Sequence, residues 1–307
     1  MQRSKLNPQW EVPIRVIICN FPVWSSLTPA VMKISSGAQH FTLSRIFCRC
    51  CPAVPCPSPS PHARSRKRSL PITHPDAADG MSPLFIKRTT IDTVIFDFDG
   101  TLAKLNIDFD RMRHVISELI SLYGIDLQIL RHRFVLEIID EAAVFLRKDS
   151  SRQAESFMRE AYGIIEDIEI EAARRGELFS KTKDLLTILK DASIHSGIIT
   201  RNCTRAVHTV FPDIASYCSV VICRDDVKHV KPHPEQLMLA IRQCGGDPAG
   251  SIMIGDHPLD IETGHNAGTL TAGVLTGHFL ETDFIQAGAD IVLPQASDVL
   301  NLMRKGP

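Results

Sequence analysis

From Met81 onward, short apolar runs alternate with amphipathic stretches along the chain. Apolar runs bounded by turn residues predict buried strands, and apolar positions at three-four spacing predict helices. Their alternation predicts an α/β fold in which parallel strands are joined by crossover helices. The predicted strands are Thr93–Phe96, Ser196–Ile199, Val220–Ile222, Ile252–Ile254, Ala272–Leu275 and Ile291–Leu293, and the clearest helices between the later strands are Lys183–Asp191 and Pro234–Cys244.

The interval between the first two predicted strands departs from this alternation, because it carries almost only helical spacing. A parallel crossover needs only about a dozen residues, so most of this interval is surplus. We therefore expect a separate helical domain, residues 104–179, inserted into a core made of residues 81–103 and 180–307. Ligands of open parallel sheets bind beyond the carboxyl ends of the strands, so the insert is a candidate lid.

Residues 1–80 form a different kind of polypeptide. They hold 10 Lys and Arg against 3 Asp and Glu, whereas the remainder holds 24 against 32, so the two parts carry formal charges of +7 and −8. The segment has no sustained period and ends in a Pro/Ser/Arg-rich run, which predicts a disordered basic leader. Three interpretations stay open: an organellar transit peptide, a nuclear or nucleic-acid-binding patch at residues 64–68, and an upstream extension that precedes a translation start at Met81.

Composition narrows the class of protein. Of the 307 residues, 44% are hydrophobic and 22% charged, as in globular proteins, and the net charge of −1 argues against a dedicated nucleic-acid-binding protein. The cysteines within residues 48–56 lack the paired spacing of a zinc site. Those at Cys203, Cys218, Cys223 and Cys244 lie in or near apolar stretches, which indicates reduced thiols of an intracellular protein. We expect a cytoplasmic protein, or an organellar one if the leader is a transit peptide, with no nucleic-acid or membrane partner.

Two carboxylates follow the first predicted strand. In V-I-F-D-F-D-G-T-L, Asp97 and Asp99 stand at i and i+2, and Gly100 lets the backbone turn sharply. Like charges this close repel unless a cation lies between them, and Mg²⁺ best matches the oxygen ligands. A calcium loop is excluded, because its sixth and twelfth positions hold Leu102 and Asp108 instead of Gly and Glu. Acidic residues of a surface turn are the other interpretation, which the apolar run leading into these acids disfavours.

Three later strand ends also carry polar side chains. In S-G-I-I-T-R-N, the Thr200 hydroxyl and the following main-chain amides are placed to hold a phosphate oxygen. In V-K-P-H-P-E, the prolines restrict the backbone around Lys231, which suits a positioned charge rather than a solvated one. In I-M-I-G-D-H-P-L-D, Asp256 would complete the acidic metal cluster, and Asp260 would orient Lys231 or a metal-bound water from one helical turn later.

These four pieces, separated by 103, 31 and 25 residues, resemble the motifs of the haloacid dehalogenase superfamily of phosphohydrolases. The resemblance covers about residues 91–304 and is closest to the phosphoglycolate phosphatase-like branch with a helical cap. It implies a Rossmann-like, doubly wound parallel sheet core with an inserted α-helical cap domain. It also implies Mg²⁺ as the cofactor and a small phosphorylated metabolite as the substrate of a monomer or homodimer.

The resemblance assigns roles to the motif residues. Asp97 is the nucleophile that forms an aspartyl-phosphate, and Asp99 is the acid and then the base. Dehalogenases and phosphonate-cleaving members lack an acid at the place of Asp99, so phosphatase chemistry is favoured. The assigned metal ligands are Asp97, the Asp99 main-chain carbonyl and Asp256. The assigned phosphate-binding groups are Thr200, the Arg201 amide and Lys231. Asp260 contacts these groups rather than the substrate.

Two alternatives remain open. A sugar phosphomutase of the same superfamily shares all four motifs, and a non-catalytic phosphate-ligand-binding protein could use the same pocket. Arg201 departs from the motif, because relatives more often have asparagine there, and in this chain Asn202 comes one place later. Basic residues of the insert could contact a second anionic group of the substrate or be solvated; they are Arg111, Arg113, Arg131, His132, Arg133 and Arg147. We expect His257 and His265 to be structural.

Overall fold

In a computed structural model of the chain, the described residues are 83–303, except residue 133. The predicted leader, with its cysteines and its basic run, and the candidate Arg133 lie outside the described residues.

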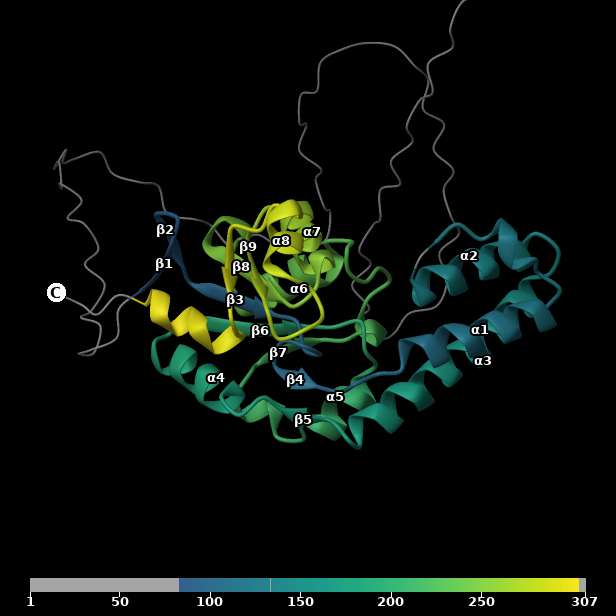
Figure 1. Ribbon diagram of the computed structural model, residues 1–307, viewed down its shortest axis with the longest axis horizontal. Helices are drawn as coiled ribbons and strands as arrows, with labels where there is room; N and C mark the ends of the chain where they lie inside the picture. The colour runs from purple at the N-terminus through teal and green to yellow at the C-terminus, as the bar shows by residue number, and fades with distance from the viewer. Residues whose placement is uncertain (1–82, 133, 304–307) are drawn as a thin grey trace, which may run out of the picture. The chain divides into compact units, whose positions relative to one another are not determined.

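A six-stranded parallel sheet forms the centre of the fold (Figure 1). Its order is β10–β9–β8–β3–β6–β7. Counted along the chain, β3 is the first strand of this sheet and β8 the fourth, and the two lie side by side. The order of the strands reverses at this pair, and such a point is where ligands of doubly wound sheets bind. The strands are β3 (Thr93–Phe96), β6 (His195–Ile199), β7 (Val220–Ile222), β8 (Ser251–Gly255), β9 (Leu270–Val274) and β10 (Ile291–Leu293).

The α/β fold class predicted from the sequence is confirmed, and each predicted strand is present. Both faces of the sheet are covered, so every residue of β3 and β8 is buried. On one face, Ile95 and Met253 pack with α6, and on the other Phe96 and Ile254 belong to the cluster that includes α4. Figure 1 shows α6, α7 and α8 on one side of the sheet and α4 and α5 on the other. The helices are α4 (Thr182–Asp191), α5 (Thr204–Val210), α6 (Glu235–Cys244), α7 (Pro258–Ala267) and α8 (Glu281–Gln286).

A helical segment is inserted between β3 and β6, as the spacing predicts. It consists of α1 (Phe109–Leu122), α2 (Val135–Arg147) and α3 (Ser151–Ala173), which pack on one another. The side chains of Asp108 and Ser150 accept main-chain N–H groups and so fix where α1 and α3 begin. Two short antiparallel strands, β4 (Ala103–Lys104) and β5 (Glu177–Leu178), pair where the chain leaves the sheet and returns to it.

A hairpin before the sheet was not predicted. β1 (Leu84–Ile86) and β2 (Thr89–Ile91) pair in antiparallel register around Lys87 and Arg88, whose φ angles are 47° and 70°. Such turns favour glycine or asparagine, so the lysine and arginine here gave no sign of a turn. The remaining short 3₁₀ turns are η1 (Leu127–Ile129), η2 (Ile214–Ser216), η3 (Arg224–Asp226), η4 (Pro248–Gly250) and η5 (Ala296–Leu302). Within the described part of the chain, no helix has the length and apolarity needed to cross a bilayer.

Candidate active site

Three carboxylates meet beyond the carboxyl ends of β3 and β8. Asp97 follows β3, and its main-chain N–H donates to the Ile254 carbonyl at 2.8 Å, which ties the two strand ends together. One carboxylate oxygen each from Asp97, Asp256 and Asp260 lies within 4.8 Å of the others. Among residues 83–303 with the exception of 133, this is the one group of acidic, His or Cys side chains close enough to share a metal ion. Hard oxygen donors of this kind fit Mg²⁺.

Lys231 lies between two of these acids. Its Nζ is 2.6 Å from Asp97 Oδ1 and 2.7 Å from Asp260 Oδ1, and the lysine is only 3% exposed. Burial acts to lower the pKa of Lys231, but the charges of Asp260 and Asp97 outweigh it and raise that pKa. Lys231 is therefore a fixed positive charge inside the acidic cluster.

Asp260 is held by the first turn of α7. Its carboxylate accepts the His257 N–H at 3.1 Å, while His257 Nδ1 accepts the Leu259 N–H at 2.9 Å. Pro258 occupies the first helical position, where no donor is needed. This capping arrangement leaves the other Asp260 oxygen for Lys231, and it gives His257 the structural role that the sequence predicted.

The cluster holds more negative charge than one lysine can offset. Burial raises the pKa of Asp97 to about 7, against the opposing charge of Lys231, and the neighbouring Asp260 adds to the rise. Burial raises the pKa of Asp256 to about 9, and the charges of Asp97 and Asp260 raise it further. A divalent cation would remove this excess charge, so the donor set fits a Mg²⁺ ion both in ligand chemistry and in electrostatics.

Gly100 supplies the sharp turn that the first motif predicts. Its φ of 82° lies in the left-handed region, and its N–H donates to the Ala103 carbonyl at 2.7 Å. A Cβ atom at Gly100 or at Gly277 would overlap the Asp256 carboxylate. The two glycines thus leave the space that this carboxylate occupies.

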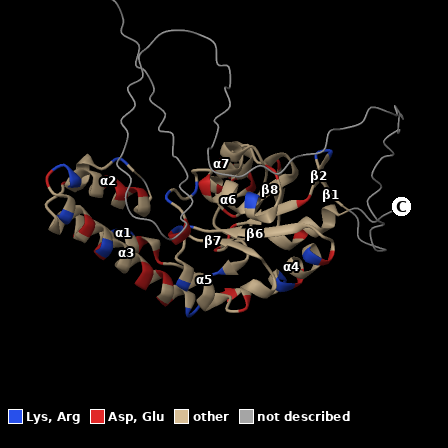
Figure 2. Ribbon diagram, turned by 180° about the vertical axis from the view of Figure 1, so that it is seen from behind, with Lys and Arg blue, Asp and Glu red and all other residues tan. Residues whose placement is uncertain are grey.

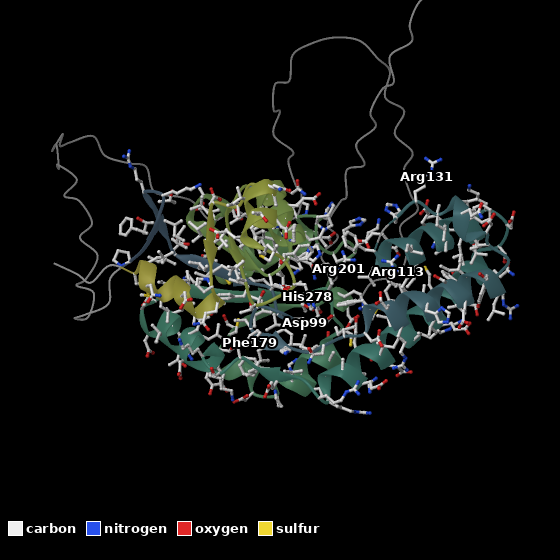
Figure 3. The ribbon with its side chains drawn as sticks, viewed as in Figure 1. Asp99, Arg113, Arg131, Phe179, Arg201 and His278 are labelled. Atoms are coloured by element: carbon white, nitrogen blue, oxygen red, sulfur yellow. The ribbon has the colours of Figure 1, made fainter. Side chains whose placement is uncertain are left out.

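Asp99 stands apart from the three-carboxylate group. It is half-buried, and its Oδ1 accepts the Leu105 N–H at 2.9 Å. Burial raises the pKa of Asp99, and the amides of Leu105 and Gly100 oppose that rise, as does His278 beside it (Figure 3). A carboxyl group with a raised pKa is suited to hold a proton and give it up.

The loop after β6 carries Thr200 into the same edge of the sheet. Thr200 is 1% exposed, its N–H donates to the Ile222 carbonyl at 3.1 Å, and its Oγ1 accepts the Asn202 N–H at 3.2 Å. The loop is therefore folded back on the threonine hydroxyl, with successive main-chain amides beside it.

The Arg201 side chain bonds to the insert rather than to the acidic cluster. Its two terminal nitrogens reach the two Glu137 oxygens on α2, each at 2.8 Å, and its guanidinium lies over the Phe134 ring. It also donates to the Lys231 carbonyl. Burial acts to raise the pKa of Glu137, but the bonds from Arg201 outweigh it and lower that pKa. The sequence singled out Arg201 for its amide and gave no sign of Glu137.

A buried ion pair joins α3 to η3, whose Arg224 also bonds to the loop after β6. The Arg224 guanidinium pairs with the Glu169 carboxylate, and their side chains are 7% and 4% exposed. Glu169 Oε2 also accepts the Cys203 N–H at 2.9 Å, and Arg224 Nη1 donates to the Arg201 carbonyl at 3.0 Å. The insert thus contributes a carboxylate that holds the backbone of the loop after Thr200.

The described basic candidates lie at the surface of the insert, and the side chains of Arg111 and Arg147 have partners there. Both charge signs occur along α1 and α3 (Figure 2), and Arg111 pairs with Glu171 across these helices at 2.8 Å. Arg147 donates to the Met158 sulfur. Arg113 and Arg131 (Figure 3) are exposed, and so is His132.

Residues 94–274 match the family of haloacid dehalogenase-like hydrolases. Pyrophosphatase PpaX of Bacillus cereus is 32% identical over 224 residues, 68% of this chain and 98% of its own. N-acetylmuramic acid 6-phosphate phosphatase of Pseudomonas aeruginosa is 28% identical over 235 residues, 71% and 97% of the two chains. Phosphoglycolate phosphatase of Salmonella paratyphi A is 28% identical over 240 residues, 70% and 93%. A structure of a haloacid dehalogenase-like hydrolase from Bacteroides fragilis superposes with a TM-score of 0.52 at 26% identity, over 68% of this chain and 99% of that one.

Proposed function

The chain belongs to the haloacid dehalogenase-like hydrolase family, and from this premise we propose that it is a Mg²⁺-dependent phosphatase acting on a small phosphate monoester. The substrate is of the phosphoglycolate or sugar phosphate type, and the reaction passes through an aspartyl-phosphate. The observation that carries the proposal is the cluster of three carboxylates, two of which are paired with Lys231, at the point where the strand order reverses. The names of the relatives, two phosphatases and a pyrophosphatase, support it.

Asp97 is the nucleophile. One of its carboxylate oxygens attacks phosphorus, the bond from phosphorus to the ester oxygen breaks, and the aspartyl-phosphate forms. Lys231, 2.6 Å from Asp97, opposes the rise in the Asp97 pKa that burial causes and so favours the ionised nucleophile. Its positive charge also offsets the charge of the transferring group.

Asp99 moves the protons. In the first step it donates a proton to the departing ester oxygen, which leaves as an alcohol. In the second step it takes a proton from the water that attacks the aspartyl-phosphate, and orthophosphate is released. Its raised pKa supports both roles, because the group can be protonated before the first step and regain a proton in the second.

The remaining groups bind the phosphoryl oxygens and the metal. The Thr200 hydroxyl, the Arg201 amide and Lys231 bind the non-bridging oxygens, and Asp260 orients Lys231. Asp97, the Asp99 main-chain carbonyl and Asp256 would hold Mg²⁺. When bound, this ion supplies positive charge beside the phosphoryl oxygens.

Residues 104–179 act as a cap over a core made of residues 81–103 and 180–307. The bidentate pair between Arg201 and Glu137 supports this division, because it brings α2 to the residue that follows Thr200. A cap in this position excludes water while the ester is bound.

We further propose that the enzyme works in the cytoplasm as a monomer or homodimer. The four cysteines of the described residues, Cys203, Cys218, Cys223 and Cys244, are free and buried, which fits a reducing compartment.

Phosphate release from a panel of esters with Mg²⁺ tests the proposal. The panel contains phosphoglycolate, sugar phosphates and nucleoside monophosphates, and Asp97→Asn is run beside the wild type. We expect one ester to be hydrolysed far faster than the others, and only by the wild type. Full activity of the folded Asp97→Asn protein would refute the nucleophile. An isomerised sugar phosphate in place of free orthophosphate would indicate a phosphomutase, and binding without turnover a non-catalytic protein.

A further inference from the structure

Gln236, the second residue of α6, is completely buried beneath the strand ends of the candidate active site. Its side chain bonds only to main-chain atoms. Nε2 donates to the Thr200 carbonyl at 2.8 Å and to the Ile222 carbonyl at 3.3 Å, and Oε1 accepts the Lys231 N–H at 3.2 Å. One carboxamide therefore joins the loops that carry Thr200 and Lys231.

These three bonds require the chemistry of an amide. The Thr200 carbonyl needs a donor and the Lys231 N–H needs an acceptor, and an amide has both on one planar group, whereas the Ile222 carbonyl also accepts the Thr200 N–H. An ionised glutamate accepts only, and methionine fills the same length without donating. In a site that water does not reach, losing the bonds to the Thr200 carbonyl and the Lys231 N–H leaves these two main-chain groups unsatisfied.

The two loops that Gln236 joins are far apart in the sequence, yet they must contact the same phosphoryl group. The Lys231 ammonium is already directed by Asp97 and Asp260, and the Thr200 hydroxyl is fixed by the Asn202 N–H. Those bonds orient the side chains. Among the hydrogen bonds of the described residues, the Gln236 amide bonds directly to both main chains, while the Arg201 side chain also ties its own loop to the Lys231 carbonyl.

We propose that Gln236 is a positioning residue that sets the distance between the Thr200 hydroxyl and the Lys231 ammonium. It acts through the two main chains and touches neither the substrate nor the metal. This inference rests on the proposed phosphatase function and adds to it a residue outside the four motifs. A loop displaced by about an ångström can cost on the order of a hundredfold in rate, so such a residue has a measurable effect.

The test compares Gln236→Met, which removes the donor and the acceptor, with Gln236→Glu, which keeps the shape. Gln243→Met, an exposed position on the same helix, is the matched control. Turnover of an aryl phosphate with Mg²⁺ and inhibition by orthophosphate are measured for each protein. We expect kcat/KM of Gln236→Met to fall about 10- to 100-fold, with weaker inhibition by orthophosphate, and Gln243→Met to match the wild type.

The pH dependence separates positioning from packing. In Gln236→Glu, protonation of the introduced carboxylate restores an O–H that can donate to the Thr200 carbonyl. The activity of Gln236→Glu relative to the wild type should therefore rise as the pH falls, while the ratio for Gln236→Met stays flat. If Gln236→Met fails to fold, Gln236→Glu alone carries the test through this ratio.

Wild-type kcat/KM and wild-type orthophosphate inhibition in folded Gln236→Met would overturn the inference and leave the phosphatase standing. A ratio for Gln236→Glu that falls as the pH falls would also overturn it. Absence of turnover by the wild type on every phosphate ester would overturn the proposed function, and this inference with it.

Discussion

Removing the negative charge of Glu169 should destabilise the folded chain strongly. Glu169→Gln keeps the shape of the side chain but leaves the Arg224 guanidinium, 7% exposed, with only the exposed Asp225 carboxylate, 3.9 Å from Nε, as a counter-ion. The Gln oxygen can still accept from Arg224 Nη2 and from the Cys203 N–H, as Oε2 does, but the amide nitrogen in place of Oε1 then meets the Arg224 Nη1 donor. Besides these, the guanidinium keeps its bond to the Arg201 carbonyl, its contact with the Tyr162 ring and its long pair with the exposed Asp225.

The magnitude follows from this burial. Removing one partner of a buried ion pair costs about 3–5 kcal/mol, and the surviving hydrogen bond puts Glu169→Gln at the lower end, about 3 kcal/mol. For a domain of this size, each kcal/mol lowers the melting temperature by about 2–4 °C, so we expect a drop of about 6–12 °C. Replacing both partners, as in Glu169→Gln with Arg224→Met, should cost less than the sum of the single changes, because no charge is left buried alone.

Urea unfolding followed by circular dichroism measures these differences, with thermal melts as a second readout. The control is Glu171→Gln, two residues away on α3, whose pair with Arg111 is exposed at 45% and 51% and should contribute little. If Glu169→Gln unfolds at the same urea concentration as Glu171→Gln, or if the double variant is additive, then the Glu169–Arg224 pair does not stabilise the fold.

Two further predictions concern the acidic cluster. In metal-free protein, burial raises the pKa of Asp97 to about 7 and of Asp256 to about 9, above their value of 3.8 in the unfolded chain, so the folded state binds more protons in this range. The contribution of these two carboxyl groups to the free energy of unfolding is full below pH 3.8 and is lost as the pH rises through 7 and 9. Urea midpoints measured in EDTA should therefore fall between pH 7 and pH 9, and midpoints that stay level or rise would contradict the prediction. In Gly277→Ala, the added Cβ overlaps the Asp256 carboxylate, so the Mg²⁺ concentration for half-maximal activity should rise by about tenfold. The control is Gly163→Ala, whose Cβ meets nothing within 4 Å and which should leave that concentration unchanged. Equal Mg²⁺ requirements in the two alanine variants would refute the role of that space.

The strands could be predicted because the apolar pattern that identifies each one lies within its own few residues. The strands of a buried parallel sheet are apolar on both faces, so Thr93–Phe96 and Val220–Ile222 were found with their observed bounds. The prediction Ala272–Leu275 was wrong at its ends, because β9 runs Leu270–Val274 and Leu275 is exposed after it. An apolar side chain in a following loop extends the pattern without extending the strand. The two-residue strands β4 and β5 are too short to leave any period.

Asp97, Thr200 and Asp256 could be predicted because each directly follows a predicted strand, whereas Lys231, well after Val220–Ile222, was found through its flanking prolines. Glu137, Glu169 and Gln236 could not, because each lies within a helix, where a polar residue normally indicates the solvated face. Glu169 bonds to Arg224, 55 residues later, and only the folded chain brings the two together. The Arg201 side chain shows the same limit: its position was noted, but its bond to Glu137 depends on how α2 lies against the core.

The bond from Glu169 to the Cys203 N–H has a consequence for how this protein could change over time. The loop after β6 belongs to the core in sequence, yet one of its main-chain N–H groups is bound by a carboxylate of α3. A chimera that exchanges residues 104–179 for the corresponding segment of a relative would leave Arg224 buried without its carboxylate, unless the donor segment brings one to the same place. Substitutions at positions 169 and 224 are therefore expected to occur together. At this contact the helical segment and the core cannot be exchanged independently of each other.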